Sequence, residues 1–282
     1  MLENDQLEFY KENGYLLIRN FFDQQLINYI NSTIDELIVD SKNYKVSNEK
    51  YSFDIKTSSL QRIKTPDQYI KAIAILAKHQ KIVNLLDPIL GSSIRFDGSK
   101  LNLKPPNSSS IEWHQDWAFY PHTNDSLCTV GIMLDNHTYE NGCMSVIPKS
   151  HKGPVYDHYL NGIFSGGIDL KKTNIQTENS YDLIGQSGDV TIHHVRTIHG
   201  SRPNKTNKNR RFLLFQYKAV DAWPLVQSLQ SWSSWNNNII KGCETNSPRM
   251  LSIPVKLPLP TRKLNGDIFE VQQQIENRYL IK

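Results

Sequence analysis

The stretch IEWHQDWAF, residues 111–119, belongs to the part of the chain whose pattern decides the fold. It is one of several short β-type runs that follow one another from about residue 94, with turn signals such as Asn141-Gly142 between them. Many short strands bounded by turns are typical of a β-sandwich or a barrel. The other runs are RFDGSKLNL, LCTVGIMLD, CMSVIPKS, DVTIHHV and RFLLFQYKAV. We therefore predict a mainly β fold whose core, residues 93–220, is an antiparallel double-sheet jelly roll.

The residues before this core have a mixed, largely helical pattern. GYLLIRNFF, at 14–22, predicts a short strand, and residues 22–38 carry apolar side chains at helical spacing. Residues 40–66 are polar and irregular. A Pro-Asp pair then predicts the start of a second helical region, 67–90, that ends at Gly91.

The tail, residues 221–282, is aromatic and Pro-rich and becomes helical at DIFEVQQQIENRYL. We find no internal repeat in the chain. We expect one domain over 1–282, with helical support in 1–92, the jelly-roll core in 93–220 and a segment that caps the pocket in 221–282.

Composition narrows the class of protein. The net charge of +4 is mild and the basic residues are spread along the chain, whereas a nucleic-acid-binding protein usually has a basic stripe. Three cysteines without a C-x-x-C pair fit a reducing compartment. The opening residues lack the apolar core of a signal peptide, and the longest apolar runs are too short to span a bilayer. We expect a cytoplasmic monomer or homodimer that acts on a small molecule, with no nucleic-acid or membrane partner.

WHQDW, within the opening stretch, places a histidine and an aspartate two positions apart. On a β-strand such side chains point to the same face, so His114 and Asp116 could offer a nitrogen and an oxygen to one metal ion. An isolated H-x-D is more often a polar edge strand, and Trp113 and Trp117 beside it fit packing positions. A metal site therefore requires a third ligand from elsewhere in the chain.

The segment GDVTIHHVRTIHGS, residues 188–201, supplies three histidines. His193 and His194 lie in the middle of a predicted strand, where they fit core or rim positions. His199 lies where an apolar strand ends, and the glycine after it relieves crowding. Two histidines and one carboxylate form a facial triad, which leaves open positions on Fe(II), although zinc hydrolases use similar ligands.

Arg210 separates the iron interpretation from the zinc one. It lies eleven residues after His199 and begins the run RFLLFQY. If the chain turns back through Pro203-Asn204, its guanidinium returns beside His199 and could pair with the distal carboxylate of a chelated keto acid. A hydrolase has no evident need for that cation.

In combination these motifs resemble the phytanoyl-CoA dioxygenase family of Fe(II)/2-oxoglutarate oxygenases. The resemblance rests on LNLKPP, WHQD, ENGCMSVIPKSHKG, the GDV that opens the strand towards HGS, and Arg210, and it covers about residues 95–220. It implies a cupin-like double-stranded β-helix. It implies His114, Asp116 and His199 as catalytic iron ligands, with Arg210 anchoring 2-oxoglutarate and O₂ as the oxidant.

The same resemblance extends to weaker positions. Ser201 is similar to a serine that assists the far carboxylate, and Lys104 matches a lysine near the cofactor or substrate. Gly131 stands where some members carry an aromatic residue over the cofactor, which is a departure. Asp116 separates the chain from halogenating relatives, which have a small residue at that position.

The function that follows is oxidation of an unactivated C–H bond in a small, at least partly anionic metabolite, by hydroxylation, desaturation or cyclisation, in secondary metabolism. The alternatives are a non-catalytic jelly roll with a retained metal site, and an acyl-CoA hydroxylase. For the anionic substrate we expect aromatic segments at 40–65, 153–167 and 222–236 to overhang the site. Three cations lie close to the site in sequence and would favour an anionic ligand if unpaired, namely Lys104, Arg196 and Arg202. The alternative for each, and the better one for any single residue, is that it is solvated or pairs with a neighbouring Asp or Glu.

Overall fold

The computed structural model describes residues 2–55, 57–226, 231–255, 267–275 and 278–280. Two antiparallel sheets form its core. The large sheet contains β1 (Tyr15–Ile18), β2 (Tyr51–Phe53), β3 (Leu60–Lys64), β4 (Ile94–Lys104), β6 (Leu127–Met133), β11 (Val190–His194), β13 (Arg210–Ala219) and β14 (Ile239–Lys241). The small sheet contains β5 (Ile111–His114), β7 (Met144–Val146), β10 (Tyr181–Asp182) and β12 (His199–Ser201). A separate ribbon pairs β8 (Tyr159–Leu160) with β9 (Ile163–Phe164).

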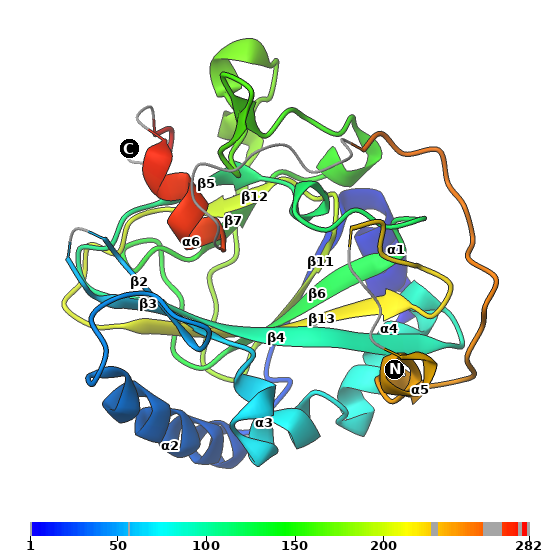
Figure 1. The fold of residues 1–282 in the computed structure, drawn as a ribbon, viewed down its shortest axis with the longest axis horizontal. Helices are drawn as coiled ribbons and strands as arrows, with labels where there is room; N and C mark the ends of the chain where they lie inside the picture. The colour runs from blue at the N-terminus through cyan, green and yellow to red at the C-terminus, as the bar shows by residue number, and fades with distance from the viewer. Residues whose placement is uncertain (1, 56, 227–230, 256–266, 276–277, 281–282) are drawn as a thin grey trace.

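The strand order gives the predicted jelly roll. In the large sheet it is β1-β11-β6-β13-β4-β3-β2, with β14 also paired to β4, and in the small sheet it is β10-β7-β12-β5. The small sheet lies across one face of the large sheet (Figure 1). The mainly β, cupin-like fold expected from the turn-bounded runs is therefore confirmed.

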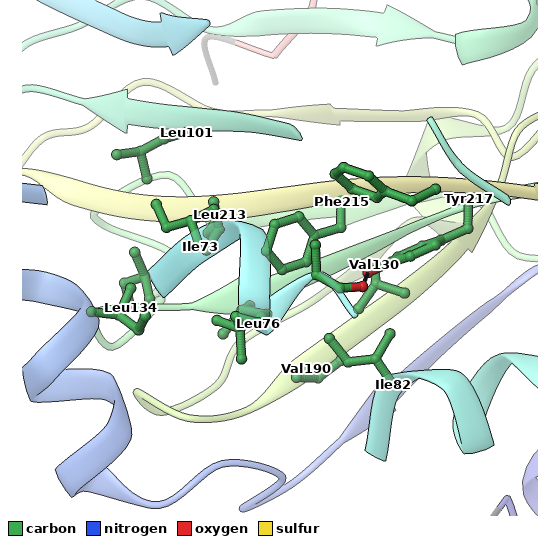
Figure 2. Packing of buried hydrophobic residues seen from close by; sticks show 14 of the residues in the cluster. Ile73, Leu76, Ile82, Leu101, Val130, Leu134, Val190, Leu213, Phe215 and Tyr217 are labelled. Atoms are coloured by element: carbon green, nitrogen blue, oxygen red, sulfur yellow. Dashed lines mark hydrogen bonds between the residues drawn. The ribbon is translucent and has the colours of Figure 1, made fainter. Parts of the chain in front are cut away.

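Helices cover the other face of the large sheet (Figure 1). They are α2 (Gln24–Ser41), α3 (Lys71–Leu76) and α4 (Gln80–Leu90). Figure 2 shows Ile73 and Leu76 of α3 towards Leu213 and Phe215 of β13, and Ile82 of α4 beside Val190 of β11. The helices thus cover the main apolar core.

Successive side chains of the large sheet alternate between its two faces, one towards the helices and one towards the small sheet. In β4 the buried Leu101 and Leu103 belong to the helix-side core, while Lys100, Asn102 and Lys104 have the opposite parity. The large sheet therefore has an apolar face towards the helices and a polar face towards the small sheet.

Most helix boundaries follow local chemistry. Asp23 caps α2, with its side chain accepting a hydrogen bond of 2.8 Å from the backbone N–H of Leu26. The predicted 67–90 region is split, because α3 ends before residue 77, but α4 ends at Gly91 as expected.

Three segments differ from the predictions. Residues 4–13 form a further helix, α1 (Asn4–Asn13), and the segment read as irregular contains β2 and β3, which extend the large sheet. The tail forms the short α5 (Trp232–Asn236) and α6 (Ile268–Val271), followed by a 3₁₀ turn at Gln272–Gln274, in place of a long helix. Part of the predicted long helix, 276–277, lies outside the described residues.

None of the helices in the described ranges combines the length and apolar character that crossing a bilayer requires. The domain boundaries proposed from the sequence stay a prediction.

Candidate active site

A cavity of about 180 Å³ lies between the two sheets. Its walls come from the polar face of the large sheet, the facing strands β5 and β12, the turn after β5, and α6. The lining residues are Arg62, Lys100, Asn102, Ile111, His114, Asp116, Phe119, Tyr120, Thr129, Met144, His193, His199, Gly200, Ser201, Arg210, Phe212, Leu214, Asp267, Ile268 and Phe269. The predicted site residues lie on this cavity, except that Lys104 lies directly behind Ser201.

His114 and His199 are neighbours across the small sheet. They are register partners on β5 and β12, and their ring centroids are 4.1 Å apart. Nδ1 of His114 donates to the Glu112 carbonyl at 2.8 Å, and Nδ1 of His199 donates to the Thr197 carbonyl at 2.9 Å. These bonds leave both Nε2 atoms free as metal ligands. Burial lowers the pKa of His114 well below its usual value, and burial and His193 lower the pKa of His199 to about 4, so both rings are neutral at pH 7.

Asp116 completes the group. Its Oδ1 lies 3.9 Å from Nε2 of His114 and 4.0 Å from Nε2 of His199. Its Oδ2 accepts from the Thr129 hydroxyl at 3.4 Å and lies 3.7 Å from Nε2 of His193. Burial alone raises the pKa of the Asp116 carboxyl, but His193 and the charge of Lys100 outweigh burial and hold that pKa well below its usual value. One oxygen therefore faces the two histidines and the other is held by the large sheet.

The way in which Asp116 reaches this position differs from the strand argument. β5 ends at His114, and Asp116 begins a 3₁₀ turn over Asp116–Ala118. The turn, and not the alternation of a continuous strand, brings the carboxylate back towards His114. Similarly, His199 begins β12 and does not follow a longer strand.

Ligand atoms of His114, Asp116 and His199 all lie within 4.8 Å of one another, and all three residues are buried. Two neutral imidazoles and one carboxylate suit Fe(II) and leave coordination positions open. The donor set therefore fits the implied iron.

Two buried basic residues lie near Ser201, with Arg210 on the cavity wall and Lys104 behind the serine. Arg210 and Lys104 are register partners on β13 and β4, and only 4% and 3% of their surfaces are exposed. The Lys104 ammonium donates to the Ser201 hydroxyl at 2.9 Å, and Nη2 of Arg210 donates to the Gly142 carbonyl at 3.0 Å. No carboxylate within the described ranges forms an ion pair with either cation.

Two polar atoms of Arg210 indicate what this part of the cavity would bind. Its Nε and Nη1 are buried and have no hydrogen-bond partner in the described part of the chain. Unpaired buried donors are costly, and a planar guanidinium suits a carboxylate. Burial lowers the pKa of Arg210 to about 10, so it keeps its charge at pH 7. The distal carboxylate of 2-oxoglutarate fits this cradle.

The route by which Arg210 reaches the site also differs from the prediction. β12 pairs with β5 and β7, whereas β13 lies in the large sheet between β4 and β6. The chain therefore crosses from one sheet to the other after Pro203, and no hairpin forms. Arg210 faces the cavity from the wall opposite His199.

Gly131 has a clear packing role. A Cβ at Gly131 would lie 2.3 Å from Cζ of Phe212 and 2.7 Å from the Thr191 hydroxyl. The Phe212 ring, which lines the cavity and lies 5.6 Å from the Arg210 guanidinium, occupies the space beside the glycine. β6 has a glycine at position 131 and no aromatic residue there. The aromatic ring beside this position comes from Phe212 on β13.

We expect Gly131→Ala to displace Phe212 and to lower the free energy of unfolding by about 1–3 kcal/mol, because the added methyl overpacks this wall. Chemical denaturation measures the loss. Gly153→Ala is the matched control, since a Cβ there meets only the Ser150 carbonyl at 3.3 Å. Equal stability of the two variants would contradict the placement of Phe212.

The remaining residues of the WHQDW stretch are structural, as predicted. Trp113 and Trp117 are buried in apolar clusters outside this cavity. The Gln115 side chain donates to the Pro154 and Arg196 carbonyls, away from the His-Asp-His cluster. The other histidines read as surface or structural residues also lie off the cavity; they are His122, His137, His151 and His158.

Two of the three cations close to the site in sequence are paired. Arg196 forms an ion pair with Asp125 at 3.0 Å, and Arg202 forms one with Asp182 at 2.6 Å. The interpretation that they lie unpaired near the site is therefore wrong for both, and the alternative, pairing with acidic residues, holds. Lys104 alone fits the interpretation of an unpaired cation.

The described residues of the predicted overhanging segments contribute little to this cavity. Trp223 stacks on Trp232 and contacts Trp235, and Tyr51 and Phe53 belong to the helix-side core. Aromatic residues from other positions line the cavity, namely Phe119, Tyr120, Phe212 and Phe269. Within 40–65 the lining residue is Arg62.

Several lining residues were not predicted. Lys100 and Asn102 alternate with two leucines on β4, and this period-two pattern, running on to Lys104, was a signal that could have found them. His193 on β11 also lines the cavity, with its Nε2 3.7 Å from Oδ2 of Asp116. Arg62 could not be found in this way, because β3 was not predicted.

Comparison with known proteins identifies the class. The family model described as "Phytanoyl-CoA dioxygenase (PhyH)" matches residues 10–212. A Stutzerimonas stutzeri protein named "probable alpha-ketoglutarate-dependent hypophosphite dioxygenase" is 38% identical, over 98% of this chain and 99% of its own length. The peroxisomal phytanoyl-CoA dioxygenase of Rattus norvegicus is 25% identical, over 78% of this chain and 70% of its own.

Solved structures share the fold. The crystal structure of EctD from S. alaskensis with 2-oxoglutarate and 5-hydroxyectoine superposes with a TM-score of 0.70 at 18% identity, covering 92% of this chain and 89% of that one. The epimerase SnoN, in complex with Fe³⁺, alpha-ketoglutarate and nogalamycin RO, gives a TM-score of 0.65 at 18% identity, covering 94% and 96%.

The fold, the His-Asp-His cluster and these matches define an iron- and 2-oxoglutarate-dependent oxygenase that uses O₂ as co-substrate. The chain belongs to the phytanoyl-CoA dioxygenase family.

Proposed function

We propose that this oxygenase holds iron through His114, Asp116 and His199 and binds the distal carboxylate of 2-oxoglutarate through Arg210. The mutual distances of the three ligand atoms and the two unpartnered Arg210 nitrogens support this assignment. Lys104 donates a hydrogen bond to Ser201 and so orients the serine hydroxyl, while burial and the neighbouring Arg210 hold the pKa of Lys104 well below its usual value. When bound, iron with 2-oxoglutarate and O₂ supplies a strong oxidant, with succinate and CO₂ as co-products.

We propose that the substrate is a small oxoanion with an oxidisable hydrogen, and that hypophosphite is the first candidate. The observation that carries this proposal is the 38% identity to the S. stutzeri protein across nearly the full length of both chains. The cavity supports it, since about 180 Å³ is small beside the ~300–1,000 Å³ of drug-sized pockets. An acyl-CoA thioester is much larger than this space.

The reaction balances as the insertion of one oxygen atom into a P–H bond. Hypophosphite, 2-oxoglutarate and O₂ give phosphite, succinate, CO₂ and one proton. One atom of O₂ enters phosphite and the other enters succinate. The protein's part is to hold the anion beside the metal and to exclude water from the oxidant, for which the cover by Phe119, Ile268 and Phe269 is suited.

Oxidation of a C–H bond in an organic acid of secondary metabolism stays a prediction, as does the monomeric or homodimeric state. The reaction is assigned to the cytoplasm. Free Cys128, Cys143 and Cys243 support a reducing compartment.

Phosphorus NMR tests the substrate. We expect the protein with Fe(II), 2-oxoglutarate, O₂ and hypophosphite to form phosphite and succinate in equal amounts. Asp116→Ala is the control for metal-independent oxidation. Succinate formation that hypophosphite does not stimulate, with no phosphite, would exclude hypophosphite and direct the search to small organic acids.

A further inference from the structure

Lys100 lies on the cavity wall midway along β4. It has the same parity as Asn102 and Lys104, so the three side chains follow one line along the polar face of the large sheet. Lys104, at one end of the line, belongs to the co-substrate end. Lys100, at the other end, lies beside Tyr120, with its ammonium 5.3 Å from the centroid of that ring.

The other cations of the cavity already have a partner or a proposed one. Arg62 forms an ion pair with Asp267 at 3.1 Å, and its Nε donates to Oδ1 of Asn102 at 2.8 Å. Its guanidinium also stacks on Phe269 at 4.6 Å. Arg210 faces the distal carboxylate of 2-oxoglutarate in the proposed function, and Lys104 donates to Ser201. By contrast, no carboxylate among the described residues lies within ion-pair distance of Lys100.

Lys100 is also on the metal side of the cavity. The negative charge that acts on it most strongly is that of Asp116, the proposed iron ligand. Tyr120 interacts with both residues. Its ring contacts the Lys100 ammonium, and burial together with the charge of Asp116 raises the pKa of its hydroxyl. Anything held by the Lys100 ammonium would therefore lie near the reacting centre.

Charge balance leaves Lys100 in need of an anion once the site is loaded. The charge of a divalent metal would be balanced by Asp116 together with one carboxylate of 2-oxoglutarate, and Arg210 would balance the other, distal carboxylate. Lys100 then adds positive charge to a half-buried site, where an uncompensated charge is unfavourable. A monoanionic substrate would compensate it.

We propose that Lys100 determines substrate specificity by binding an oxygen atom of the small oxoanion and holding it against the metal. This inference rests on the proposed function for the identity of the oxoanion. The requirement for a compact anion rests on Lys100 itself.

The test is an anaerobic titration, which measures binding without turnover. The visible charge-transfer band of the protein with Fe(II) and 2-oxoglutarate reports 2-oxoglutarate affinity as it forms, and its perturbation reports hypophosphite affinity. We expect Lys100→Met to raise the dissociation constant for hypophosphite roughly tenfold to 100-fold, as for loss of a charge-assisted hydrogen bond, and to leave that for 2-oxoglutarate nearly unchanged. Lys100→Arg, which keeps the charge, should retain part of the affinity.

Lys64→Met is the matched control. Lys64 is the register partner of Lys100 on β3, but its ammonium already lies 3.7 Å from Glu270 and donates to the Asn48 carbonyl at 2.9 Å. We expect this variant to bind hypophosphite as the unsubstituted protein does. Thermal unfolding of each variant verifies that it is folded.

Phosphite, sulfite and formate are titrated in the same way. These anions distinguish a failure of the role of Lys100 from a failure of hypophosphite as the substrate. Normal hypophosphite binding by Lys100→Met overturns the role of Lys100 and leaves the proposed function standing. If the unsubstituted protein binds another of these anions but not hypophosphite, and Lys100→Met loses it, the role of Lys100 stands and the substrate is wrong. Equal loss of 2-oxoglutarate binding, or no anion binding by the unsubstituted protein, overturns the inference.

Discussion

Asp116→Ala is expected to abolish iron binding and succinate formation together. The substitution removes one of three ligand atoms, and the two that remain, on His114 and His199, bind a divalent ion weakly. Loss of a group that merely supports a ligand already costs about 10–100-fold in metal affinity, so loss of the ligand itself should cost more. Iron content after anaerobic reconstitution and succinate yield measure the two effects.

Asp125→Ala provides the matched control. Asp125 is another partly buried carboxylate, nine positions further along, but it pairs with Arg196 at 3.0 Å and does not line the cavity. This variant should keep its iron. Near-normal iron content and succinate formation in Asp116→Ala would remove Asp116 from the metal site.

The sequence was sufficient to predict which residues come together as a candidate metal site, because their chemistry is local. An H-x-D pair and an H-G-S segment are recognisable without any knowledge of which strands pair. The pairing is what the sequence could not provide. His114 and His199 are register partners only because β12 lies next to β5, which places their rings 4.1 Å apart.

The partners of charged residues were harder to predict than the ligands. The sequence allowed Arg196 and Arg202 to be paired but could not name their partners, because Asp125 and Asp182 lie 71 and 20 positions away in the chain. Long side chains reach partners that only the tertiary fold brings close, so the pairing of a surface or rim cation is invisible to local reading. The reverse holds for Lys100. Its local sequence does not show that it lacks a carboxylate partner, and this becomes visible only once the two sheets are assembled around the cavity.

The pocket cover was misassigned for a related reason. Abundant aromatic residues in 222–236 suggested a lid, yet Trp223, Trp232 and Trp235 pack on one another. Part of the lining comes from α6 instead, whose N-cap residue Asp267 pairs with the buried Arg62. Composition identifies aromatic segments, but ion pairs and strand edges decide which of them reach the site.

Arg210→Ala is expected to weaken 2-oxoglutarate binding while leaving iron binding largely intact. The guanidinium lies on the cavity wall, and its Nε and Nη1 have no hydrogen-bond partner among the described residues. Arg210 is not part of the group that could hold the metal. Removing one partner of a buried charge pair costs roughly 2–5 kcal/mol, which is a rise of about 30-fold or more in the dissociation constant. Titration of the iron-loaded protein with 2-oxoglutarate measures it, and Arg210→Lys should recover only part of the loss because a point charge replaces a bidentate fork.

Arg211→Ala separates this role from a general loss of positive charge. Arg211 has the opposite parity on β13 and points away from the cavity, where it pairs with Asp135 at 2.7 Å and with Asp35 at 3.3 Å. Its removal should lower the melting temperature, because the half-buried Asp135 loses its partner, but it should not change the affinity for 2-oxoglutarate. A loss of 2-oxoglutarate affinity in Arg211→Ala without one in Arg210→Ala would mean that the cavity lies on the other face of β13, and the whole assignment of the polar face would then be wrong.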